Sequence, residues 1–227
     1  MFKKNIVFYL FYFSSFLSLG YGVYINNYRI MFLSVFTMFI FLIFDYFVYR
    51  ISLKVSYLFK FFLFSFLFLS EILGEAFSFY SIYYWWDDML HFICGVMATY
   101  FGYVLYNSLS VNSKGILVSV IFSFCFSMCF GVLWEFIEFS YDKYLGSDMQ
   151  KDVVLESFNT AYFSSVDNIE NISRISKTEI HTDSGVIVVD GYLDIGLFDT
   201  INDLFIDMIG SFFASFGIFF IKKDFIV

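Results

Sequence analysis

Long runs of apolar residues, separated by short polar stretches, dominate the pattern along the chain. Six runs come close to the roughly 20 residues that a helix needs to cross a hydrocarbon core about 30 Å thick. Because lipid offers no hydrogen-bond partners to open strand edges, each run is predicted to be helical. The predicted helices span residues 5–24, 30–48, 55–79, 88–106, 115–139 and 200–221. We therefore expect an all-α integral membrane protein with about six transmembrane helices, forming a single membrane domain over residues 1–227.

One long polar segment, residues 140–199, separates the last two predicted helices. Its first part, residues 141–174, has mixed charge and many Ser and Asn residues, typical of an irregular or short-helical excursion. In residues 175–193, β-forming residues flank the turn sequence Asp183-Ser184-Gly185, which predicts a small β-hairpin. We expect this loop to be extracytoplasmic and its hairpin to be exposed.

The composition excludes a water-soluble domain. Hydrophobic residues make up 60% of the chain and the mean hydropathy is +0.76, against an apolar share of about 45–50% in soluble domains. A single core of this size could not bury so many aromatic side chains. The 37 Phe, 18 Tyr and absent Pro indicate AT-rich codons, as in a low-GC bacterium. The expected location is a bacterial cytoplasmic membrane, with the lipid bilayer as partner and no nucleic acid.

The basic residues of the short loops indicate the orientation, because Lys and Arg favour the cytoplasmic side. The short loops on the other side contain a single basic residue, Arg29. Both termini are therefore predicted to be cytoplasmic. The basic start of the first run resembles a signal peptide, but the run is too long and lacks a cleavage site, so we expect a retained helix. The cytoplasmic basic residues are Lys3, Lys4, Arg50, Lys54, Lys60, Lys114, Lys222 and Lys223.

Four of the predicted helices carry acids toward the outer face. Residues three or four apart share a helix face, so each group of acids forms a stripe on its own helix. An Asp at the centre of a membrane helix costs about 2.5–3.5 kcal/mol on insertion scales. No Lys or Arg lies inside these helix ends, which leaves bound protons or bound cations to neutralise the acids. Carboxylates with one imidazole favour Mg²⁺, Mn²⁺ or Ca²⁺, allow Zn²⁺ or iron, and argue against copper.

The candidate residues follow from this placement. The candidate metal ligands are Asp88, His91, Glu135, Glu138, Asp199, Asp203 and Asp207. Glu71, Glu75, Asp87 and Asp142 are candidates for supporting the ligands. Glu135 or His91 is the candidate catalytic base. We expect His91, Glu135, Glu138 and Asp203 to converge on one pocket.

Simpler interpretations remain open for single residues. Asp87, Asp88 and Asp199 suit helix starts, where an acid complements the helix dipole. His91 alone would be typical of a hydrogen-bonded core histidine, and Glu71 and Glu75 could face water. His181 is expected to be solvated on the hairpin. Asp45 is the only other acid within a predicted helix, toward its cytoplasmic end.

Three motifs carry a resemblance to a known family. WWDDMLHFICG (85–95), LWEFIEFSYD (133–142) and GYLDIGLFDTINDLFIDMIGS (191–211) resemble the uncharacterised YjdF-like family of bacterial multi-pass membrane proteins. The motifs cover about half of the chain and are more distantly similar to VanZ-like proteins, although Glu138 stands where those often have glutamine. The resemblance implies the location and the candidates Asp88, His91, Glu135, Glu138, Asp199 and Asp203, but no settled activity.

Three functions remain open at this point. In the first and favoured hypothesis, a cation held by the carboxylates acts on a lipid-linked or envelope substrate at the outer leaflet. In the second, the acids form a cation or proton path of a transporter. The cytoplasmic halves of the helices, almost wholly apolar apart from Asp45, argue against such a path. In the third, a metal or polar cluster only holds the helices together, and the protein is not an enzyme.

Overall fold

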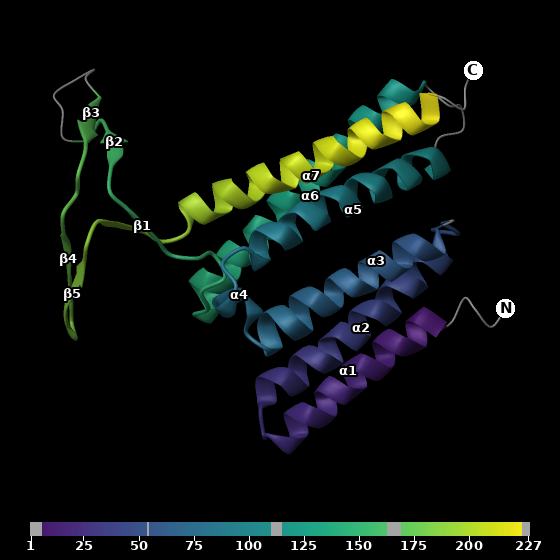
Figure 1. Ribbon diagram of the computed structural model, residues 1–227, viewed down its shortest axis with the longest axis horizontal. Helices are drawn as coiled ribbons and strands as arrows, with labels where there is room; N and C mark the ends of the chain where they lie inside the picture. The colour runs from purple at the N-terminus through teal and green to yellow at the C-terminus, as the bar shows by residue number, and fades with distance from the viewer. Residues whose placement is uncertain (1–5, 54, 110–114, 163–168, 224–227) are drawn as a thin grey trace. The chain divides into compact units, whose positions relative to one another are not determined.

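The computed structural model describes residues 6–53, 55–109, 115–162 and 169–223 (Figure 1). The chain divides into two compact units. The first, which we call the helical unit, comprises Met1–Val132 and Leu204–Val227, and the second, the loop unit, comprises Leu133–Asp203. The division cuts two helices.

Helices form over all six predicted apolar runs. Five of the described helices are long and apolar enough to cross a membrane: Tyr28–Arg50, Tyr57–Ala76, Trp86–Leu109, Ile116–Leu145 and Leu197–Ile221. The first helix has 19 residues, and its crossing remains a prediction. The long α-helices are α1 (Ile6–Tyr24), α2 (Tyr28–Arg50), α3 (Tyr57–Leu67), α5 (Trp86–Leu109), α6 (Ile116–Leu145) and α7 (Leu197–Lys223).

Polar caps mark the starts of two helices in the helical unit. The side chain of Asn27 accepts a hydrogen bond from the backbone N–H of Ile30 at the start of α2. Ser56 accepts one from the backbone N–H of Phe59 at the start of α3. Such caps satisfy N–H groups that have no partner within the helix, and the absence of proline leaves the following apolar runs unbroken.

The third predicted helix, residues 55–79, is not a single α-helix. After α3 the chain continues as a π-helix, η2 (Phe68–Ala76), which contains Glu71. Ser78 then adopts a left-handed conformation with φ of 61°, which ends the helical path before the short α4 (Phe79–Ile82). A prediction from hydrophobic periodicity cannot detect the change from α-helix to π-helix, because the apolar composition continues through the π-helix.

The interior of the helical unit contains both aromatic and polar side chains, whereas its outer surface is largely apolar. Helices α1, α2 and α3 lie side by side (Figure 1) around the rings of Phe41 and Phe64, whose centroids are 4.6 Å apart. Elsewhere, buried hydroxyls occupy the interior, as where Ser34 donates to Ser18 at 3.0 Å. Exposed side chains along the same helices are mostly Phe, Leu, Ile and Tyr. A soluble protein rarely exposes so large an apolar surface to water, whereas the hydrocarbon core of a bilayer can surround it.

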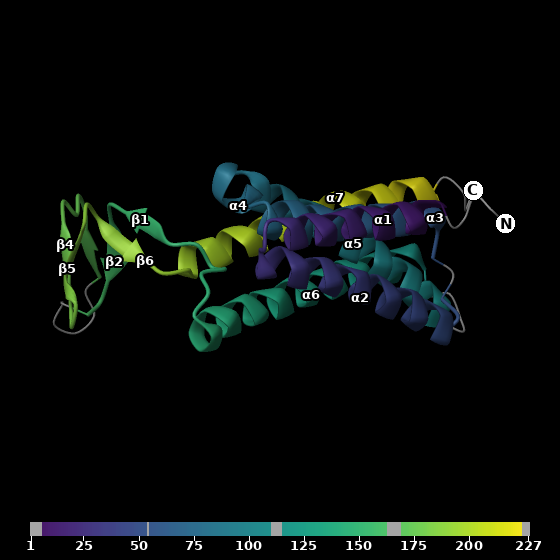
Figure 2. The same cartoon turned by 90° about the horizontal axis from the view of Figure 1, so that it is seen from below.

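The loop unit contains three two-stranded antiparallel sheets. Strands β4 and β5 run side by side (Figures 1 and 2), with Thr182 opposite Gly185, so the turn lies at Asp183–Ser184. Strand β1 pairs with β6, and β2 pairs with β3. The strands are β1 (Val153–Leu155), β2 (Phe158–Thr160), β3 (Glu170–Ile172), β4 (Thr178–Thr182), β5 (Gly185–Val189) and β6 (Tyr192–Asp194).

Two features of this region differ from the sequence expectation. Helix α6 continues to Leu145, beyond the predicted end at residue 139. Residues 141–174 also contain β1, β2 and β3 rather than short helices. Strands of three residues are too short to show the alternation from which a strand is recognised in a sequence.

Candidate carboxylate site and buried histidine

Three acids of the loop unit form one buried group. Glu135 and Glu138 lie three residues apart near the end of α6, and Asp203 lies near the start of α7. These residues are 3%, 6% and 1% exposed. One carboxylate oxygen from each lies within 4.8 Å of the other two. Of the four residues expected to share a pocket, these three therefore come together.

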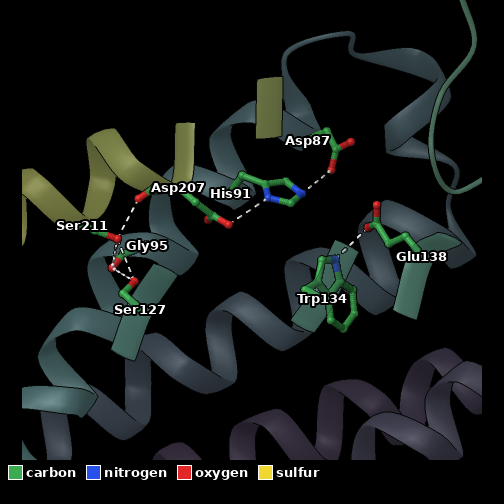
Figure 3. Close-up of polar contacts among 8 residues, drawn as sticks. All are labelled: Asp87, His91, Gly95, Ser127, Trp134, Glu138, Asp207 and Ser211. Atoms are coloured by element: carbon green, nitrogen blue, oxygen red, sulfur yellow. Dashed lines mark hydrogen bonds and ion pairs between the residues drawn. The ribbon is translucent and has the colours of Figure 1, made fainter. Parts of the chain in front are cut away.

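The carboxylate of Glu138 is held in place by its own helix. The indole Nε1 of Trp134 donates a hydrogen bond of 2.7 Å to Oε1 of Glu138 (Figure 3). Trp134 is partly exposed, so the indole joins an apolar surface to the buried acid. A neutral donor lowers the cost of burying one negative charge, but it does not neutralise the three acids together.

The geometry of the three carboxylates suits one divalent cation. Mg²⁺ binds oxygen at about 2.0–2.1 Å and Ca²⁺ at about 2.3–2.6 Å. Two ligands of one such ion are then roughly 3–5 Å apart, which matches the spacing of at most 4.8 Å. Three oxygen donors also fit the preference of hard cations. Protonation is the other way of neutralising buried carboxylates.

Asp142 and Asp199 contact the backbone of the loop. Asp142 accepts hydrogen bonds from the backbone N–H groups of Met149 and Gln150, at 2.6 and 2.8 Å, and from the hydroxyl of Ser147. Asp199 accepts one from the backbone N–H of Lys151 at 2.9 Å. Both acids thus stabilise the chain where it leaves α6 and enters the strands.

The buried histidine of the helical unit lies between two acids. His91 is on α5, and its Nε2 lies 3.7 Å from Oδ1 of Asp87, one helical turn earlier (Figure 3). Its Nδ1 lies 3.5 Å from Oδ2 of Asp207 on α7. Asp88, the predicted ligand, is half-buried at the neighbouring position, but the carboxylate 3.7 Å from Nε2 belongs to Asp87.

Small residues bring the helices around Asp207 close together. A Cβ at Gly131 of α6 would lie 2.5 Å from Oδ2 of Asp207, and a Cβ at Gly95 of α5 would clash with its backbone oxygen. One turn along α7, the hydroxyl of Ser211 lies 2.7 Å from that of Ser127, which donates to the carbonyl of Gly95 (Figure 3). These contacts fix the backbone on both sides of the buried acid.

The comparisons with known proteins place the chain in a family. A family described as "Predicted membrane protein (DUF2238)" matches residues 6–224. The chain belongs to this family. It is also 35% identical over 81 residues to an uncharacterised protein of Thermotoga maritima, a match that covers 36% of this chain and 42% of that protein. The chain thus spans less than half the length of this relative. No solved structure matches.

Two acids of this family member form ion pairs that sequence spacing did not reveal. The carboxylate of Glu75 on η2 pairs with Arg29, in the first turn of α2. The carboxylate of Asp45 on α2 pairs with Lys60 on α3. Each acid therefore has a neutralising partner and no need of a shared cation. Glu71 is half-buried on η2.

Sequence reasoning overlooked the small residues of the site. Each of these small residues lies four positions from His91 or from an acid, and therefore on the same face of its helix. Gly95 follows His91, Gly131 precedes Glu135, and Ser211 follows Asp207 by four residues. Small residues in line with acids on a membrane helix indicate a face where another backbone approaches closely.

Proposed function

We propose that the protein holds a divalent cation with Glu135, Glu138 and Asp203 and uses it to process a lipid-linked or envelope substrate. The single observation that supports the cation is the approach of three buried carboxylate oxygens to within 4.8 Å of one another. Three anions at this spacing repel strongly in a medium of low dielectric constant. A shared ion of opposite charge removes that repulsion and satisfies the oxygens at once.

The proposed location is the outer leaflet of a bacterial cytoplasmic membrane, with both termini cytoplasmic. The basic residues of the short loops support this orientation. Membership of a family of predicted membrane proteins supports a location in a membrane. In this orientation the start of α7, with Asp203, belongs to the outer half of the membrane. A substrate with a lipid tail can reach such a site laterally, whereas a soluble substrate must approach from the loop side.

The proposed chemistry is Lewis-acid catalysis. A bound Mg²⁺, Mn²⁺ or Ca²⁺ would polarise a phosphoryl or carbonyl oxygen, or activate a water molecule. The three carboxylates would hold the ion, and Trp134 would keep Glu138 oriented through its hydrogen bond. The likeness of the motifs to YjdF-like proteins, and more distantly to VanZ-like proteins, is compatible with this arrangement and supplies no reaction of its own.

Thermal unfolding of the full chain in lipid nanodiscs tests the cation site. A ligand present at 100 times its dissociation constant stabilises the folded state by about 2.7 kcal/mol. We expect Mn²⁺ to raise the unfolding temperature of the wild type, and to have little effect on Glu135→Gln or Asp203→Asn. Glu75→Gln, which removes an acid paired with Arg29, is the matched control and should respond like the wild type. An equal response of all four proteins would refute the site.

A separate assay tests the substrate. Nanodiscs containing a polyprenyl phosphate lipid should release inorganic phosphate in the presence of Mn²⁺ with the wild type, and not with Glu135→Gln. Release that is independent of Mn²⁺ and of Glu135 would contradict the proposed chemistry. Cation binding without turnover of any phosphorylated lipid would leave the cation as a structural clamp between α6 and α7.

Transport is the second candidate function, favoured by one observation. Buried hydroxyls continue along α6 at Ser119, Ser123 and Ser127, so the interior is less apolar than the sequence suggested. However, Ser123 donates to the carbonyl of Ser119 on its own helix, and Asp45 is paired with Lys60. Cation-dependent flux into liposomes that is lost in Ser123→Ala and Ser127→Ala would support transport instead.

A further inference from the structure

His91 lies between two carboxylates of the helical unit. The imidazole faces a carboxylate on each side, with Nε2 3.7 Å from Asp87 and Nδ1 3.5 Å from Asp207 (Figure 3). A neutral imidazole has one N–H and one lone pair. It can therefore donate to one of the two acids, while its lone pair faces the other. That second contact is repulsive unless a proton or a metal ion lies there.

Burial indicates which nitrogen carries the hydrogen. The side chain of Asp207 is 3% exposed and that of Asp87 is 13% exposed. A buried carboxylate without a donor costs more than one that reaches solvent. The N–H is therefore best placed on Nδ1, toward Asp207, which leaves the lone pair of Nε2 directed toward Asp87.

We propose that His91 Nε2 and Asp87 Oδ1 are two ligands of a second metal ion, and that Asp207 is a positioning residue that fixes the tautomer of His91. The proposal uses none of the residues Glu135, Glu138 and Asp203 and does not rest on the function proposed above. Histidines that bind metals usually donate their other ring N–H to a carboxylate, which is the role given to Asp207.

The distances fit this assignment. Zinc binds histidine nitrogen at about 2.0–2.1 Å and carboxylate oxygen at about 2.0–2.2 Å, so two ligands of a tetrahedral ion are about 3.4 Å apart. The separation of Asp87 and His91 is 3.7 Å, a few tenths of an ångström longer. One nitrogen and one oxygen donor favour Zn²⁺, Fe²⁺ or Mn²⁺ over Mg²⁺ and Ca²⁺.

The surroundings of Asp207 support its positioning role. The residue is 2% exposed, and its Oδ1 has no hydrogen-bond partner within the described part of the chain. Gly131 leaves the space that Oδ2 occupies, since a Cβ there would lie 2.5 Å away. The backbone oxygen of Asp207 meanwhile accepts from Ser211 at 2.7 Å. Contacts to both its side chain and its backbone therefore fix the position of Asp207 beside His91.

Nitrogen NMR of the full chain in nanodiscs tests the proposal directly, because the chain has two histidines, His91 and His181. A His181→Gln variant assigns the signals. We expect metal-free His91 to carry its hydrogen on Nδ1 at pH 7.5, and Zn²⁺ to shift the Nε2 signal. An imidazolium that is unchanged by Zn²⁺, or a hydrogen on Nε2, would overturn the proposal.

Zinc affinity of matched variants provides the second readout. Asp87→Asn should weaken Zn²⁺ binding at least tenfold, whereas Asp88→Asn, the neighbouring half-buried acid, should change it less than about twofold. Asp207→Asn should weaken it about 10–100-fold and change the tautomer seen by NMR, which a purely structural role would not do. Equal losses in Asp87→Asn and Asp88→Asn would refute the assignment. Glu135→Gln should leave the His91 signal intact, so this site and the carboxylate site can fail independently.

Discussion

The contact between α5 and α7 at Gly210 makes a sharp prediction. A Cβ at Gly210 would lie closer than 3.0 Å to the carbonyl oxygen of Phe92, an approach that real Cβ atoms do not make, and 3.1 and 3.3 Å from its carbonyl carbon and Cα. Because these are backbone atoms, no rotamer change relieves the clash, and the helices must separate by about 1 Å to regain ordinary contact. Gly210→Ala should therefore destabilise the protein.

The magnitude follows from two opposing effects. Alanine is favoured over glycine within a helix by about 1 kcal/mol, whereas overpacking of this kind costs about 1–3 kcal/mol or more. Gly217 lies on the same helix with no neighbouring atom within 4 Å in the described chain, so Gly217→Ala shows the helix effect alone. The difference between the two variants isolates the packing cost, which we expect to be about 2 kcal/mol or more.

Reversible unfolding in mixed micelles, followed by far-UV circular dichroism, measures both variants. Gly217→Ala should be as stable as the wild type or more so, and Gly210→Ala clearly less stable. The same separation should weaken the contact of Asp207 with His91, so Gly210→Ala should also lower Zn²⁺ affinity. Equal stability of the two variants would show that α5 and α7 are not in backbone contact.

Three further predictions concern the loop unit and the orientation. Asp142→Ala removes three hydrogen bonds to residues 147–150 and should destabilise this unit by about 1–3 kcal/mol, with faster amide exchange at Met149 and Gln150; unchanged exchange would contradict this role. Burial, and then the charges of Asp152 and Asp142, raise the pKa of Asp148, so the folded unit binds this proton more tightly than the unfolded chain does. Its stability should rise as the pH falls from the raised pKa toward the ordinary value, and Asp148→Asn should remove this contribution, which amide exchange at several pH values would measure. A cysteine at Ser184 should react with an impermeant thiol reagent from outside intact cells, and labelling only after lysis would reverse the predicted orientation.

The sequence was sufficient for features that depend on local pattern. Apolar length located the helices, and β-forming residues around Asp183–Ser184 marked the position where β4 and β5 pair. The end of α6 at Leu145 was missed, because its last turns are polar and resemble a loop. The π-helix at Glu71 was missed, because it shares the composition of the helix before it.

Features that depend on packing between distant segments were not accessible. Asp87 and Asp88 are four and three residues from His91, so spacing alone could not choose between them. The approach of Gly131 to Asp207 joins positions 76 residues apart in numbering, and nothing local to either residue reveals it. The convergence of Glu135, Glu138 and Asp203 was foreseen only because burying each acid alone in a membrane is costly.

The central claim is that a cation binds to Glu135, Glu138 and Asp203. The most direct measurement is the Mn²⁺ retained by the detergent-purified chain after gel filtration, determined by elemental analysis for the wild type and for Glu135→Gln/Asp203→Asn. Glu138 alone cannot hold an ion tightly, so the wild type should retain about one more Mn²⁺ per chain than the double variant. Equal Mn²⁺ content in both proteins would contradict the cation site and leave protons to neutralise the three acids.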